Sequence, residues 1–342
     1  MKTLPPHPTV KMADIAQAAG VSLATVGRVL HKSGYVSPEN REKIERLIQD
    51  LGYVPNKMAQ GLKNRQSKLI GHLMVFNPNM LFAKISLAVN QAALAQGFHV
   101  LSMTGHRDLQ EEEAQVNELL GHQVDGVIIT SNGHIPRALI QKLVELNIPV
   151  VMVERTYDLP QVDRIRVDDL SGAEEAVQHL IAHGHQRIGF IGMENFHEVE
   201  ELRYQGYCQA LARAGVESVA QYICLMPEYS VEAGAQAMET LLKLAEPPTA
   251  VFTTSDLFAC GVLQALYQHG KRVPEDLSLV GYDDTLSTLL APPVTSVGLS
   301  LEEIGENAIA LLLQRMTAMD SPANVVTIKT VLIERQSVRS IS

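Results

Sequence analysis

Short apolar runs rich in β-branched residues alternate with longer helical stretches from residue 69 to about residue 335. The candidate strands are LIGHLMVF (69–76), HVLSM (99–103), GVIIT (126–130), PVVMVE (149–154), RIRVD (164–168), RIGFIG (187–192), YICLM (222–226), AVFTT (250–254) and LSLVGYD (277–283). Strand–helix alternation produces parallel sheets covered by helices on both faces. The number of strands predicts an α/β body of two lobes and not one wide sheet.

The passages between the two lobes are expected at two places. The helix that should follow a strand is missing near 155–163 (RTYDLPQVD), so we predict the first crossover there. We predict the second near 284–299, because TSVGL (295–299) precedes a helix rich in Leu and Ile.

A different pattern occupies the N-terminal part, in VKMADIAQAAGVSLATVGRVLH (10–31). Apolar residues with helical spacing form one face of a first helix: Met12, Ile15, Ala16 and Ala19. Gly20 is expected to end this helix with a positive φ, and Ser22 to act as N-cap of a second helix. The apolar stripe of that helix consists of Val26, Val29 and Leu30. Two short helices joined by a tight turn predict a helix-turn-helix, and ENREKIERLIQDLGY supplies a third helix.

The charge distribution supports a nucleic-acid partner for this segment. Residues 1–65 contain ten Lys and Arg against five acidic residues, a net charge of +5, whereas the remainder carries −15. A basic head on an acidic body indicates that the head binds a polyanion. The residues on or beside the second helix that are expected to face DNA are Ser22, Leu23, Ala24, Thr25, Arg28 and His31.

Residues 9–71 resemble the lactose repressor/galactose repressor family of bacterial transcriptional regulators. The matching runs are T-V-K-M-A-D-I-A, G-V-S-L-A-T-V-G-R-V-L, Y-V-S, L-G-Y-V-P-N, A-Q-G-L and I-G. The resemblance implies that Leu23 and Ala24 set the base preference, and their apolar side chains favour contact with thymine methyl groups. Arg28 is expected to contact a base or phosphate. Gly27 departs from the family, which usually has Ser there.

The resemblance extends to a hinge at 56–68. In the family this segment folds when two copies meet on DNA, and a Leu from each copy enters the minor groove. Leu62 has that place here, and Asn56 is a further expected DNA contact. An ordinary linker, with Leu62 packed on the body, is the alternative interpretation. The predicted domains are a head (1–55), this hinge, and a body for effector binding and dimerisation (69–342).

Segments of the body, among them IPVVMVER, PPTAVFTTSDLFACG and VPEDLSLVGYDD, also read like that family, whose body has the periplasmic sugar-binding-protein fold. Ligands of open α/β sheets bind at the carboxyl ends of strands, here between the lobes. The residues so placed are Phe76, Asn77, Phe82, Thr130, Ser131, Glu154, Ser255, Asp256 and Asp283. The resemblance adds Arg203 and Tyr229. A structural role as helix cap is the alternative for Asp256 and Asp283, and Ser255 replaces an amide side chain of the lactose repressor.

These features predict a DNA-binding regulator, a repressor in the leading interpretation, that binds a near-palindromic operator as a homodimer. The expected effector is a sugar or sugar derivative. The alternatives are a nucleobase corepressor, a protein partner, or a solute-binding protein. No catalytic arrangement, cofactor or metal site is expected; the histidines of H-x-x-x-H-x-H (179–185) lack further ligands at suitable spacing. The absence of a signal peptide or apolar span predicts a cytoplasmic protein.

Overall fold

The computed structural model describes residues 10–54, 66–75, 79–105, 109–131, 135–154, 157–194 and 198–341. The chain divides into two compact units, Met1–Ser67 and Lys68–Ser342. No helix in the described ranges is long and apolar enough to span a membrane.

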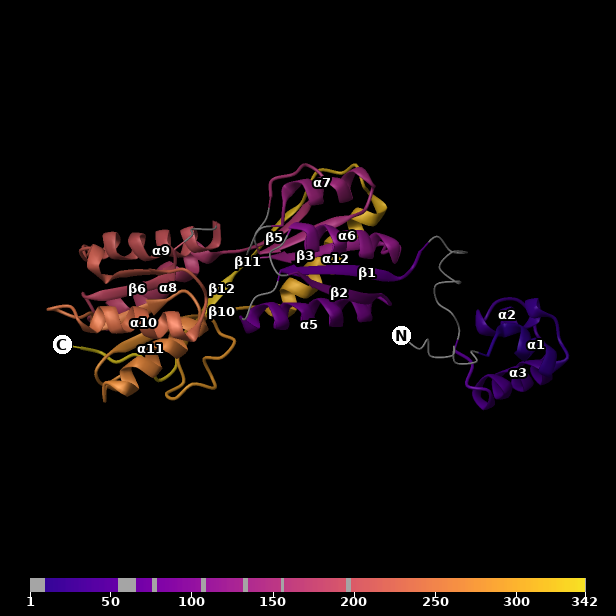
Figure 1. Ribbon diagram of the computed structural model, residues 1–342, viewed down its shortest axis with the longest axis horizontal. Helices are drawn as coiled ribbons and strands as arrows, with labels where there is room; N and C mark the ends of the chain where they lie inside the picture. The colour runs from indigo at the N-terminus through magenta and orange to yellow at the C-terminus, as the bar shows by residue number, and fades with distance from the viewer. Residues whose placement is uncertain are drawn as a thin grey trace. The chain divides into compact units, whose positions relative to one another are not determined.

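The first unit contains three helices, α1 (Met12–Ala19), α2 (Leu23–Leu30) and α3 (Pro38–Asp50) (Figure 1). Gly20 has φ +71°, and the N–H of Val21 donates to the carbonyl of Ala16, so α1 ends in the tight turn that the sequence predicts. The hydroxyl of Ser22 accepts the N–H of Thr25 and caps α2. The core of this unit comprises Ile15, Ala16, Ala19, Val26, Val29, Val36 and Ile44.

The first lobe of the body is a parallel six-stranded sheet in the order β11-β5-β4-β3-β1-β2. Its strands are β1 (Leu69–Val75), β2 (His99–Gly105), β3 (Gly126–Ser131), β4 (Val150–Glu154), β5 (Asp163–Val167) and β11 (Val325–Ile328). Helices α5 (Met80–Ala95) and α12 (Leu301–Thr317) pack on one face. Helices α6 (Leu109–Gly121) and α7 (Arg137–Glu145) cover the other face, so alternate residues of each central strand enter different cores.

The second lobe repeats this arrangement in the order β12-β10-β9-β8-β6-β7. Its strands are β6 (Ile188–Met193), β7 (Ile223–Met226), β8 (Ala250–Thr253), β9 (Ser278–Asp283), β10 (Thr295–Leu299) and β12 (Thr330–Ile333). All neighbours are parallel except β12, which is antiparallel to β10. Helices α8 (Asp169–Ala182) and α9 (Glu198–Ala214) cover one face, and α10 (Val231–Leu242) and α11 (Asp256–Gln268) the other (Figure 1). The two-lobed α/β fold predicted from the sequence is confirmed.

The chain passes between the lobes three times: between β5 and α8, between β10 and α12, and between β11 and β12. The first crossover therefore lies later than the predicted 155–163, and the second lies at the end of the predicted 284–299. The described residues between β4 and β5, 157–162, contain no helix, yet Leu159 and Val162 are buried in the core of the first lobe. The segment without a helix therefore connects two neighbouring strands of the same sheet, β4 and β5, and does not pass between the lobes. The third crossover, through Lys329 alone, was not expected.

A buried ion pair joins the C-terminal part of α12 to the start of β5. The guanidinium of Arg315 donates from Nε and Nη2 to Oδ2 and Oδ1 of Asp163, at 2.9 and 2.6 Å. Both side chains are almost fully buried, and the backbone N–H of Asn324 donates to the same carboxylate. This two-point pairing fixes the returning chain on the first lobe.

Candidate functional site

The exposed face of α2 presents small and apolar groups at its N-terminus. Leu23 is 49% exposed, and Ala24 beside it is also exposed. The hydroxyl of Thr25 lies 2.9 Å from that of Ser22, which keeps the Thr25 side chain half-buried against the cap. This end of the helix therefore offers methyl groups more than hydrogen bonds.

Arg28 is the exposed cation of the same helix, with His31 directly after the helix end. Its aliphatic part lies over the turn that follows: a Cβ added to Gly34, which has φ +67°, would lie 3.3 Å from Cδ of Arg28. The guanidinium has no acceptor in the described part of the chain, so it is free for a phosphate or a base edge.

Tyr35 lies in this turn and was missed by the sequence reasoning. Its side chain is 85% exposed and follows directly after the turn at Gly34, beside the aliphatic part of Arg28. The predicted DNA contacts lie on α2 and at its two ends, whereas Tyr35 lies in the turn after the helix, and an aromatic residue after Gly34 was the available signal.

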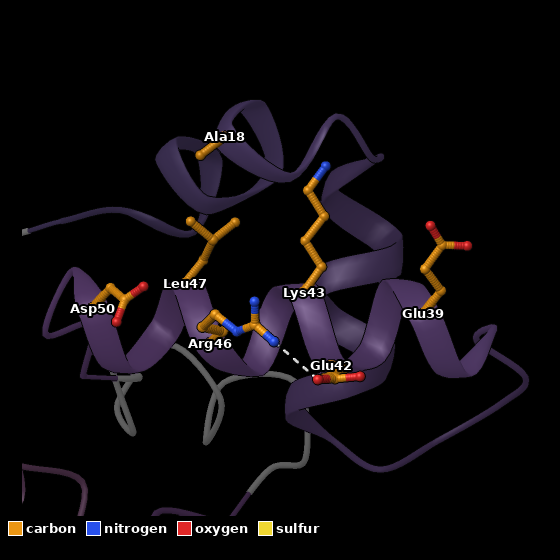
Figure 2. Close-up of a pocket in the computed structure, with 7 residues that line it drawn as sticks. All are labelled: Ala18, Glu39, Glu42, Lys43, Arg46, Leu47 and Asp50. Carbon is orange, nitrogen blue, oxygen red and sulfur yellow. Dashed lines mark hydrogen bonds and ion pairs between the residues drawn. The ribbon is translucent and has the colours of Figure 1, made fainter.

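The groove between α1 and α3 has a different chemistry (Figure 2). Its lining combines acidic and basic side chains: Ala18, Glu39, Glu42, Lys43, Arg46, Leu47 and Asp50. Figure 2 shows Lys43 and Leu47 projecting toward α1, and Nζ of Lys43 donates to the carbonyl of Ala19 at 2.9 Å. The lysine thus satisfies the C-terminal end of α1, and the acids make this groove unsuited to a polyanion.

Arg203 of α9 is the centre of a buried polar cluster in the body. Its Nε donates to Asp169 at 2.8 Å, and its Nη1 donates to the carbonyl of Thr254 at 2.6 Å. Nη1 also lies 3.6 Å from Oδ1 of Asp283, and Cζ lies 3.8 Å from the ring centroid of Tyr282. The arginine and the aspartate that the sequence singled out are therefore neighbours.

Glu154 and Asp283 end equivalent strands of the two lobes, β4 and β9, each third in its sheet. Both are buried and have left-handed backbone, with φ +73° and +87°. Such strain in non-glycine residues is found mostly at functional sites. We name Glu154, Asp169, Glu200, Arg203 and Asp283 the interlobe cluster.

Several contacts join the lobes near this cluster. Asn79 of the first lobe donates from Nδ2 to Oδ2 of Asp283 at 2.7 Å, while its own Oδ1 caps α5. Lys84 of α5 donates to the carbonyl of Thr285 at 2.9 Å. Arg166 of β5 lies 3.3 Å from Glu198 of α9. These polar contacts hold the two lobes together.

Burial sets the electrostatics of the cluster. Burial, with the negative charges of Asp169 and Asp283, raises the pKa of Glu154 to about 8. The positive charge of Arg203 lowers this pKa but does not offset the other effects. Burial likewise raises the pKa of Asp283 to about 7, and it raises the pKa values of Asp169 and Glu200. One guanidinium does not compensate four carboxyl groups.

Two members of the cluster, Asp169 and Glu200, were not among the predicted residues, nor was Asn79. These residues lie at or near the N-termini of helices, whereas the prediction selected mainly residues at the carboxyl ends of strands. Glu200 accepts hydrogen bonds from the N–H of Met193 and the hydroxyl of Tyr229. Tyr229, which was predicted, therefore touches the cluster.

Other predicted effector residues have partners inside the protein. The carboxylate of Asp256 accepts from the N–H groups of Thr285 and Leu286 at 2.6 and 2.7 Å and from the hydroxyl of Ser287 at 2.6 Å. Ser255 is fully buried and caps α11. These hydrogen bonds give both side chains structural roles, which is the alternative interpretation for Asp256; the ligand contacts of Ser255 and Asp256 stay predictions.

The remaining predicted residues differ in their surroundings. Phe82 is buried in the core between α5, α12 and the first sheet. The hydroxyl of Thr130 lies 2.8 Å from Nε2 of His72, and Ser131 is buried at the end of β3. Phe76, Asn77, Asn56 and Leu62 lie outside the described residues.

Comparison with known proteins gives two family matches. Residues 11–56 match the bacterial regulatory proteins of the lacI family, and residues 177–338 match a periplasmic binding protein-like domain. The HTH-type transcriptional regulator CelR of Thermobifida fusca is 36% identical over 339 residues, which cover 97% of this chain and 98% of that protein. The chain belongs to the lacI family.

Solved structures agree with this membership. The lac repressor dimer bound to operator and the anti-inducer ONPF has a TM-score of 0.85 and 28% identity, covering 97% of this chain and all of that one. The CelR–cellobiose complex has a TM-score of 0.72 and 34% identity, covering 96% and 99%. This lacI-family protein is a DNA-binding transcriptional regulator with an effector-binding domain, not an enzyme.

The histidines of the H-x-x-x-H-x-H run have other partners. His185 lies 2.9 Å from the hydroxyls of both Thr249 and Ser278. His183 bonds the carbonyl of His179. Within the described ranges no group of three potential ligands could hold a metal ion.

Proposed function

We propose that this lacI-family regulator represses transcription by binding a near-palindromic operator as a homodimer, and that a sugar or sugar derivative bound at the interlobe cluster controls this binding. The observation that carries the proposal is the interlobe cluster itself. It places a buried guanidinium and strained strand-end carboxyl groups between two lobes of a chain that also has an exposed DNA-recognition helix.

The composition of α2 favours a particular mode of DNA reading. Leu23 and Ala24 suit thymine methyl groups, and Arg28 suits a phosphate or guanine. Since few hydrogen-bonding groups are available, much of the specificity must come from the spacing of two heads across a symmetric site. The lac repressor dimer, which is bound to its operator, is similar to this chain over 97% of its length.

The effector is expected to act through the relation between the lobes. Asn79 and Lys84 bond across the lobes, and the chain joins the lobes only by three short crossovers, about which we expect the lobes to rotate. A ligand that bonds both lobes shifts the equilibrium between their arrangements by its difference in affinity. The CelR–cellobiose complex supports a sugar as the ligand class.

The experiment is selection of the full chain on random-sequence duplex DNA, followed by gel-shift titration at several salt concentrations. We expect an enriched inverted repeat and a steep fall in affinity with salt. Sugars are then added to the complex, and one of them should change the affinity. Enrichment of no repeat, or an affinity independent of salt, would refute operator binding.

A further inference from the structure

The third crossover between the lobes belongs to an extended segment, 325–333, which we name the crossover ribbon (Figure 1). It consists of β11, Lys329 and β12, and each of these strands is the last of its sheet in the described structure. Asn324 and Ile328 accept hydrogen bonds from β5 through their carbonyl groups. Because the backbone groups of a parallel strand point alternately to either side, those of Val325 and Thr327 point away from β5. The ribbon therefore presents an open strand edge that continues from one lobe to the other.

The side chains of the ribbon divide into a packed side and an open side. Ile328 is buried, and Val326 and Leu332 pack on the cores of the first and second lobes respectively. The alternate residues are all exposed: Val325, Thr327, Lys329, Val331 and Ile333. The exposed fractions of the three apolar residues among them are 47%, 61% and 37%. A row of exposed β-branched residues on an open edge is a template for another strand.

The charged residues on the open side of the first lobe are cationic. Arg164 and Arg166 of β5 are the register partners of Val325 and Thr327, so their side chains lie on the same side of the sheet. Each arginine already has a carboxylate partner, at 2.9 and 3.3 Å. Lys329, in the middle of the ribbon, is exposed and forms no ion pair with a described residue. The ribbon therefore presents one uncompensated positive charge with apolar residues on either side of it.

Lys329 distinguishes between the possible occupants of this edge. If two copies of the ribbon paired about their midpoints in antiparallel register, their lysines would lie opposite each other, and like charges so placed are destabilising. A segment with Asp or Glu at that point gains an attraction instead. The chain after residue 65 carries a net charge of −15. Charges more than about 10 Å away are largely screened at physiological salt, so the nearest cation has the larger effect.

We infer that the crossover ribbon is a docking edge for an extended segment of a partner protein, with an acidic residue opposite Lys329 and β-branched residues on either side. Main-chain hydrogen bonds supply the affinity of such an added strand, and its side chains supply the selectivity. Because the segment contacts β11 and β12 together, its affinity depends on the arrangement of the lobes. Docking requires neither effector nor operator; only its effect on DNA binding rests on the proposed function.

The test is a fluorescence anisotropy titration of the full chain without DNA. The probes are two labelled nine-residue peptides with Val at odd and Thr at even positions, except that the central residue is Glu in one and Lys in the other. We expect saturable binding of the glutamate peptide, about fivefold or more tighter than that of the lysine peptide, because an opposite-charge pair replaces a like-charge pair. The difference should decrease as salt is added. No binding of the glutamate peptide, or equal affinity for the two, overturns the inference.

Two substitutions test whether the peptide binds at the ribbon. Lys329→Glu should reverse the preference, so that the lysine peptide binds more tightly. Lys271→Glu, at another exposed lysine of the same body, is the matched control and should keep the preference of the wild type. Thr327→Pro removes an outward N–H and should weaken binding of the glutamate peptide, with its Tm as the check on folding. An unchanged preference in Lys329→Glu would place the peptide elsewhere and contradict the inference.

Sedimentation velocity distinguishes a partner segment from a second copy of the chain. We expect the wild type and Thr327→Pro to have the same oligomeric state. An assembly larger than a dimer that is lost in the variant would make the ribbon an interface between copies and overturn the inference. Gel-shift titration of the same preparations reports operator binding separately. A failed peptide titration therefore leaves the proposed function standing, and a failed gel shift leaves the docking edge standing.

Discussion

Replacing Glu154 by Gln is expected to stabilise the body at alkaline pH far more than at acidic pH. Burial, the negative charge of Asp169 and that of Asp283 raise the pKa of Glu154 from its ordinary value of 4.5 to about 8. The folded protein therefore binds this proton more tightly than the unfolded chain does. Its stability falls as the pH rises from about 4.5 to about 8. Gln has the shape of the protonated carboxyl group and carries no charge to bury.

The size of the effect follows from the two pKa values. The variant should exceed the wild type by about 1 kcal/mol at pH 5 and by on the order of 4 kcal/mol at pH 8. For a domain of this size, each kcal/mol changes the Tm by roughly 2–4 °C. We therefore expect a Tm difference of about 3 °C at pH 5 and roughly 10 °C at pH 8.

Thermal unfolding followed by circular dichroism between pH 5 and pH 8 measures this difference. Glu217→Gln, an exposed carboxyl group in the same body, serves as control and should show the same pH dependence as the wild type. A Glu154→Gln protein that is less stable than the wild type at pH 8 would show that Glu154 is ionised and favourably paired. The reasoning about burial would then be wrong.

Four further substitutions test other parts of the molecule. Gly27→Ala should stabilise the head by about 1 kcal/mol, because an added Cβ meets no atom within 4 Å; an unchanged or lower Tm of the head transition would contradict this. Asp163→Ala should cost about 3–5 kcal/mol in urea unfolding, since it leaves Arg315 buried without its partner; a loss below about 1 kcal/mol would mean that water reaches the site. Arg203→Ala should abolish the effector response in gel shifts while operator binding persists, and a response at unchanged effector concentration would remove Arg203 from the site. Leu62→Ala should weaken binding to the operator much more than to unrelated DNA, and equal losses on both DNAs would exclude the wedge.

Local sequence signals predicted the head and most strands because they depend on neighbours in the chain. Gly20 and Ser22 mark the end of one helix and the start of the next, and both have the predicted conformations. The same holds for the carboxyl ends of β4 and β9, where Glu154 and Asp283 lie. A strand end can be read from the apolar run before it.

Contacts between distant segments were harder to predict. Asn79 meets Asp283 across 204 residues, and its neighbours in the sequence do not indicate that partner. Asp256 was expected to face a ligand, but the segment after β9 folds back and supplies its donors. The crossovers between lobes were displaced for the same reason, since the sheet to which β5 belongs is decided by its pairing with β4 and β11.

The order of strands has a consequence for synthesis of the chain on the ribosome. The first lobe begins with β1, yet it is completed by α12 and β11, which are made after all of the second lobe except β12 and the residues that follow it. Arg315 joins Asp163 152 residues after that aspartate has been added. The first lobe therefore cannot complete its sheet, and the edge of β5 lacks its partner β11, until nearly the entire protein has left the ribosome. Chaperone dependence of the nascent chain should accordingly be greatest in the interval between β5 and β11.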